Sequence, residues 1–282
     1  PLVSVFNNAQ VDAFNASGAI GALFPEGDIN VQLNFEADVW PGDCDANGEV
    51  TYLDLLPIGV YYNQAGPQRD NPSIVWEAQL APLWGTDLTP GNGDYYRVFV
   101  DSNGDGVINL ADQAAIGFNL DQTVPPGLMG TAPKPPVAPN LLNTPVTLSA
   151  VATPAAPVLP ADAQVTFEVY ANTDALNMTD LYGMGLAITF PDGWVGDASQ
   201  AAVSFDASDL GTPGVDFLQF VNASAAVVEV AFTRTSPMTS AGAIHLFDVT
   251  VPLDEQLPNG VYTANITTDA ANDAQGGAIT VE

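Results

Sequence analysis

Two twelve-residue stretches place oxygen-bearing side chains at matching positions, and these are the residues in the chain best suited to chemistry. The stretches run from Asp43 to Asp54 and from Asp101 to Asp112. Both have oxygen ligands at positions 1, 3, 5, 9 and 12, glycine at position 6 and an aliphatic residue at position 8. Three converging carboxylates per loop repel one another unless a cation lies between them, so the spacing predicts two sites for a hard divalent cation.

The spacing is that of EF-hand calcium loops, with aspartate in place of glutamate at position 12. The expected ligands are Asp43, Asp45, Asn47, Glu49, Thr51 and Asp54 in the first loop, and Asp101, Asn103, Asp105, Val107, Asn109 and Asp112 in the second. Position 7 offers its backbone carbonyl, and position 9 acts directly or through water. We therefore predict two calcium ions as cofactors. Their expected role is structural, because position 12 is the short aspartate.

The sequence around the loops indicates an internal duplication. Each loop is followed by an expected short helix, over 53–62 and 111–120, and Ile-Gly occurs four residues after each last ligand. The segment over 64–97 between the halves is expected to be an irregular insertion. It contains Trp76 and Trp84. We expect these to pack in the core of the small module, and a sugar-stacking platform is the alternative.

Four segments are expected in all. Residues 1–39 form an N-terminal β segment, in which residues 28–36 alternate with Ile29, Val31, Leu33 and Phe35 on one face. This segment is the end of a preceding domain, an extra sheet, or a strand donated to a neighbour. The calcium module follows at 40–122 and a proline-rich connector at 123–160.

Residues 161–282 contain many short alternating runs separated by turns, which favours a β-sandwich whose edge strand begins near residue 145. The runs expected to be strands are 164–170, 182–190, 228–232, 244–251, 261–266 and 278–281. The fold class is therefore mainly β with a small α calcium module.

Charge and composition exclude several classes of function. The net charge is −29, with 33 acidic and four basic residues, so nucleic acid is excluded as a partner and anionic lipid is disfavoured. No run of about 18 apolar residues exists to cross a membrane. The single cysteine, Cys44, excludes an internal disulfide and is expected to point outward from its loop. His245 is the only histidine, and we expect it to be a packed or edge residue and not a catalytic base.

Two stretches carry a family resemblance. Residues 40–119, from Trp40-Pro-Gly-Asp43 onward, resemble the duplicated calcium-binding dockerin module, with an unusually long insertion between the loops. The form of this unit looks like one found in large secreted proteins of Bacteroidetes-type bacteria. Residues 145–282 are similar to cohesin-like β-sandwiches, on Val165–Val169, Gly185–Asp192 and Gly242–Val249. The resemblance implies an extracellular, cell-surface module that binds other proteins.

These observations favour a secreted, non-enzymatic structural or adhesive protein. In this hypothesis calcium rigidifies the chain, which associates head to tail with itself into a filament or surface layer. Another surface protein is the other expected partner. The alternative is a carbohydrate-binding or cellulosome-like scaffold module whose partner is polysaccharide.

Overall fold

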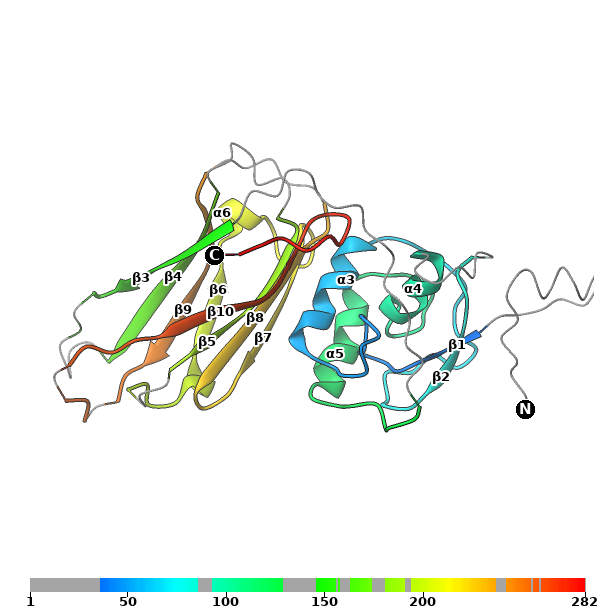
Figure 1. Cartoon of the computed structure of the whole chain (residues 1–282), viewed down its shortest axis with the longest axis horizontal. Helices are drawn as coiled ribbons and strands as arrows, with labels where there is room; N and C mark the ends of the chain where they lie inside the picture. The colour runs from blue at the N-terminus through cyan, green and yellow to red at the C-terminus, as the bar shows by residue number, and fades with distance from the viewer. Residues whose placement is uncertain are drawn as a thin grey trace, which may run out of the picture.

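The computed structural model describes residues 36–85, 93–128, 146–155, 157, 163–173, 181–190, 194–236, 242–254, 256–258 and 260–281. The strand expected over 28–36 lies outside these ranges except for Glu36, as does most of the proline-rich connector. Figure 1 shows a β-sandwich at one end of the long axis and a helical module at the other. Within the described ranges, no helix has the length and apolar composition that crossing a membrane requires.

In the part of the chain that the structure describes, the helical module combines three short α-helices, two of which follow directly on a 3₁₀ turn, with a two-stranded sheet. Its elements are β1 (Glu36–Val39), a 3₁₀ turn (Tyr52–Asp54) leading into α3 (Leu55–Val60), β2 (Gln79–Pro82), α4 (Gly93–Val100), and a 3₁₀ turn (Leu110–Asp112) leading into α5 (Gln113–Asn119). β1 pairs with β2, so residues 36–39 belong with this module. The segment expected to be irregular thus contains a strand and the first part of a helix.

The two helices predicted after the loops are present, and local hydrogen bonds explain where they begin. Thr51 caps the first 3₁₀ turn with its side chain, and the Asp54 carboxylate accepts a hydrogen bond from the Thr51 amide. Asn109 and Asp112 form the same reciprocal pair in the second half. Such capping boxes satisfy amides that the first turn leaves unpaired.

The duplication is visible in the backbone hydrogen bonds, because each loop is held by the segment that follows the helix of the other half. Position 8 of the first loop, Val50, donates to the Gln122 carbonyl and accepts from the Asp121 amide, both at 2.9 Å. Position 8 of the second loop, Ile108, does the same with Gln64 at 2.9 Å and Asn63 at 2.8 Å. If one half unfolded, the loop of the other half would therefore lose these two backbone hydrogen bonds.

The sandwich consists of two four-stranded antiparallel sheets, in the orders β10-β5-β8-β7 and β3-β4-β9-β6. The strands are β3 (Val146–Thr153), β4 (Gln164–Thr173), β5 (Gly183–Thr189), β6 (Ala202–Phe205), β7 (Phe217–Ala223), β8 (Val227–Arg234), β9 (Ile244–Pro252) and β10 (Asn265–Asn272). A one-turn helix, α6 (Ala207–Leu210), follows β6. The mainly β class and the β-sandwich in this half of the chain were predicted. β6 and β7 were missed, the strand expected at 261–266 begins at Asn265, and residues 278–281 make only isolated bridges.

The module packs on the outer face of the sheet β10-β5-β8-β7, as Figure 1 shows. Leu218 and Ala231 point outward from that sheet and are buried in the same apolar cluster as the module's Leu55 and Ile58. Glycines permit the close approach. A Cβ on Gly59 of α3 would lie 2.0 Å from the Thr233 hydroxyl oxygen and 2.5 Å from the Arg234 carbonyl oxygen. The module and sandwich therefore form one interlocked body.

We predict that Gly59→Ala separates the module from the sandwich, because the new methyl group meets the β8 backbone, which cannot move aside. The free energy of unfolding should fall by about 1–3 kcal/mol, measured by denaturant titration. Gly117→Ala is the matched control, since Gly117 holds the equivalent place in α5 and its added Cβ would be 3.7 Å from Phe220. That variant should lose nothing and gain up to about 1 kcal/mol from helix propensity. Equal losses in both variants would contradict the steric account.

Candidate metal centres

The first loop brings three carboxylates together at the start of α3. One ligand oxygen from each of Asp43, Asp45 and Asp54 lies within 4.8 Å of the others. Asp43 is 5% exposed and Asp54 is fully buried, whereas Asp45 lies at the edge. This grouping has the chemistry of a divalent-cation site, because hard oxygen donors converge from positions 1, 3 and 12 of one loop.

Backbone amides hold the carboxylates in place in both loops. The Asp54 carboxylate accepts from the amides of Asp45 at 3.0 Å and Thr51 at 2.7 Å. The Asp112 carboxylate accepts from the matching amides, Asn103 at 3.0 Å and Asn109 at 2.8 Å. Position 12 therefore orients its loop through positions 3 and 9 in each half.

Position 1 is held in a similar way. The two Asp43 oxygens accept from the amides of Asn47 and Gly48, and the two Asp101 oxygens accept from those of Gly104 and Gly106. The carboxylates at positions 1 and 12 are therefore oriented by hydrogen bonds from the loop backbone.

The electrostatics disfavour so much buried negative charge. Burial, and then the charge of Asp45, raises the pKa of Asp43 to about 6. Burial raises the pKa of Asp101 to about 6 and that of Asp112 to about 7. Burial, and then Asp45, raises the pKa of Asp54 well above its usual value. A cation in either loop would favour the ionised carboxylates and oppose these shifts.

The other predicted ligands occupy the rim of the loops. The Thr51 hydroxyl accepts from the Leu53 amide at 3.2 Å, and the Asn109 side chain accepts from the Ala111 amide at 2.7 Å, so both also cap helices. Asn47, Glu49, Asp105 and Val107 are exposed, and Asn103 is partly buried. Among the twelve predicted ligands, those at positions 1 and 12 are the most deeply buried.

Arg69 is a residue at the second loop that the sequence pattern did not predict. Its side chain is 3% exposed and donates to the Asp101 carbonyl and, at 2.8 Å, to the Gln79 side chain. Its positive charge lowers the pKa of Asp101, partly offsetting burial. The scarcity of basic residues was the available signal, since each one in so acidic a chain is expected to lie against acids.

The residues at position 2 join the two loops. Cys44 is fully buried, so the expectation that it points outward was wrong. Its thiol hydrogen bonds with Ser102, which is also fully buried, and burial raises the pKa of the thiol well above its usual value. The loops thus contact each other through their second residues, which leaves this thiol inaccessible for an intermolecular bridge.

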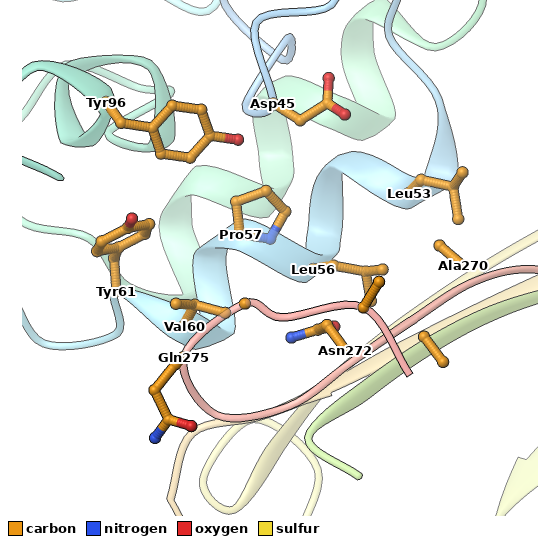
Figure 2. Close-up of a pocket in the computed structure, with 13 residues that line it drawn as sticks. Asp45, Leu53, Leu56, Pro57, Val60, Tyr61, Tyr96, Ala270, Asn272 and Gln275 are labelled. Atoms are coloured by element: carbon orange, nitrogen blue, oxygen red, sulfur yellow. The ribbon is translucent and has the colours of Figure 1, made fainter. Parts of the chain in front are cut away.

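A cavity of about 300 Å³ lies where the first loop, α3 and the C-terminal segment meet. Figure 2 shows Leu56, Pro57 and Val60 of α3 facing Asn272 and Gln275 across it, with Asp45 at its upper edge. On the Leu53 side α3 packs closely, because a Cβ on Gly185 would lie 2.2 Å from Leu53. The contact between α3 and the sandwich is thus tight beside β5, whereas a cavity remains beside the first loop.

The remaining candidate residues are engaged in packing or in ion pairs. His245 lies between Asp206, 2.7 Å from Nδ1, and Asp248, 2.8 Å from Nε2, and its ring stacks on Tyr170. Burial lowers its pKa, but the bonds to these two carboxylates raise it more, so the net shift is upward. Trp76 contacts Trp40 with ring centroids 4.9 Å apart. Trp76 and Trp84 both pack against the apolar cluster of the module.

No family model matches the sequence, and no curated protein matches it. Among solved structures, the chain is similar to a chain of a type I cohesin–dockerin complex from Clostridium thermocellum, with 10% identity, 49% of this chain and 93% of that chain covered, and a TM-score of 0.37. It is also similar to a chain of a complex between the sixth cohesin of Acetivibrio cellulolyticus scaffoldin B and a dockerin, with 13% identity, 50% and 93% coverage, and a TM-score of 0.36. A non-cellulosomal cohesin from Archaeoglobus fulgidus gives 15% identity, 42% and 74% coverage, and a TM-score of 0.29. These likenesses are low and say nothing about what this chain binds.

Proposed function

We propose that each loop binds one calcium ion, in a dockerin-like module. The donor set supports this, since three carboxylates, side-chain amide and hydroxyl oxygens and a backbone carbonyl are the ligands that calcium takes. The upward pKa shifts of Asp43, Asp101 and Asp112 support it as well, because a cation would relieve the cause of each. Thr51 and Asn109 already cap helices, so they would reach the ion through water.

The calcium in the first loop would serve to dock the module on the sandwich. The single observation that carries this proposal is the continuity from ligand to interface: Asp54 ends the loop, and α3 begins at Leu55. The residues on either side contact the sheet, since Leu53 packs over Gly185 and Gly59 over Thr233. The Tyr52 hydroxyl donates to Asp269 on β10. A cation that fixes Asp54 thereby fixes the interface.

From this we propose a non-catalytic, extracellular structural protein that associates head to tail with itself into a fibre or surface layer. Locked together, module and sandwich would form a calcium-rigidified unit. The module's helices already lie on the chain's own sandwich, so association between copies would use other surfaces. Millimolar calcium outside the cell would suffice for such loops. The strongly acidic chain would also repel itself less when divalent cations are bound.

We predict that the full chain binds two calcium ions, measured by isothermal titration calorimetry. Asp54→Asn and Asp112→Asn should each remove one ion, and Glu77→Gln, which changes an exposed acid outside the loops, should remove none. The first loop should bind more tightly, because Arg69 places a positive charge beside the second. Each site should raise the free energy of unfolding by about 2.7 kcal/mol when calcium is at 100 times that site's dissociation constant. Two ions bound by Asp54→Asn would refute the assignment of the first loop.

We also predict that the protein forms filaments in millimolar calcium and that a chelator breaks them up. Without the ion, α3 no longer holds the module at a fixed position on the sandwich, and the two ends of each copy lose their fixed orientation. Electron micrographs and sedimentation velocity with and without chelator provide the measurement. A monomer in calcium would reject self-association, and filaments that persist in chelator would reject the role of the ion.

A further inference from the structure

We propose that the outer edge of β3 accepts residues 29–35 of a second copy of this chain as an added strand. The inference rests on the proposed self-association and names its two surfaces. It assigns one surface to each end of the molecule, so that each copy would donate a strand to one neighbour and receive a strand from another.

The edge of β3 has backbone groups that point away from β4, its strand partner among the described residues. The Val146 amide donates to the Thr280 carbonyl at 3.0 Å, on the side opposite β4. Because backbone groups alternate in direction along an antiparallel strand, Leu148, Ala150 and Ala152 also direct their amides and carbonyls outward. No described residue forms a backbone hydrogen bond with these outward groups. They are a template for pairing with another strand.

The inner side of this edge is incompletely covered. Val146 is 2% exposed, and Leu148 and Ala152, which share its face, are only partly buried. Ala150, also on that face, is exposed. An added strand with apolar residues on the same face would cover the side chains of Leu148, Ala150 and Ala152 and extend the core of the sandwich.

Residues 29–35 have the sequence that this edge requires. Ile29, Val31, Leu33 and Phe35 alternate with Asn and Gln, and no charged residue stands between Asp28 and Glu36. β3 also contains no charged residue. The alternation continues into β1, where Ala37 and Val39 are buried while Glu36 and Asp38 are exposed. Seven residues span about 24 Å as a strand, close to the length of the eight-residue β3.

The other sheet edges are less suitable. β6 has only four residues. On β7, the Gln219 carbonyl already accepts from the Gln113 side chain of the module at 2.6 Å. β10 contains Asp269 and a bulge between Thr268 and Ala270, both of which oppose regular pairing at an edge. β3 is therefore the edge that a neighbour's strand would fit.

The donor must come from another copy. Phe35 is one peptide bond from Glu36, and Glu36 pairs with Pro82 in the two-stranded sheet of the module. β3 belongs to the sheet on the far side of the sandwich, and Figure 1 shows the helices and the other sheet between it and β1. Because the helices and the near sheet lie between β1 and β3, we assign the strand added to β3 to a second copy. A donor at one end and an acceptor at the other make a contact that does not close on itself, which builds filaments.

Two pairs of variants of the full chain test the inference in millimolar calcium. Ala150→Pro removes an outward amide, and a monomer tolerates proline at an edge; Ala150→Thr keeps the amide and is its control. Leu33→Glu places a charge on the apolar face of the donor, and Asn34→Glu places one on the opposite face. Sedimentation velocity should show monomers for Ala150→Pro and Leu33→Glu, and polymers for both controls. Thermal unfolding should show that all four variants are folded.

The outcomes separate this inference from the proposed function. Polymers formed by folded Ala150→Pro and Leu33→Glu would overturn the inference and leave self-association standing, whereas a monomeric wild type would overturn both. A mixture of Gln32→Cys and Ser149→Cys chains, oxidised together, should give cross-links between the two kinds of chain. A chain that carries both Gln32→Cys and Ser149→Cys is the comparison. If cross-links form only within this chain and not between the two kinds of singly substituted chain, the strand pairs with its own β3 and the assignment to a second copy is overturned.

Discussion

The burial of carboxylates at the start of α3 is the constraint on which the rest of the structure depends. Asp43 and Asp54 are withdrawn from water beside Asp45, and their raised pKa values record how unfavourable that charge is without a cation. The same aspartates organise the loop backbone and, through the Thr51 cap, the start of the helix. Because α3 then contacts the sheet, we propose that the electrostatics of this loop influence how the whole module docks on the sandwich.

The two halves of the module share one backbone plan but serve different ends. Crossed hydrogen bonds from Val50 and Ile108 tie each loop to the other half, so the halves fold together. The first helix meets the sandwich at Gly59, where no side chain fits, while the second makes looser contact at Gly117. The second loop instead contacts Arg69 from the insertion. The two loops are thus similar in backbone but differ in their contacts: the first lies against the sandwich, and the second is hydrogen-bonded to the insertion.

Local features were predictable from sequence, and features that depend on distant segments were not. The loops and the helices after them follow from ligand spacing and from Thr51 and Asn109 as caps, which act within a few residues. Strands such as β5 and β9 follow from alternation. β6 is too short to show a period, and β7 has apolar residues on both faces, since Phe217 faces the core and Leu218 the module. The burial of Cys44 and the placement of Arg69 arise from contacts across the module. Its docking on the sandwich rests on a steric match between α3 and β8 that no local pattern encodes.

Hydrogen–deuterium exchange of the full chain, with calcium and with chelator, tests the central claim most directly. The account predicts that removing calcium speeds exchange in residues 52–60 and in the outward-facing β8 segment around Thr233. Exchange in β4 and β9, which lie in the far sheet, should stay unchanged. Equal protection of residues 52–60 in both conditions would contradict the claim that calcium in the first loop holds the module on the sandwich.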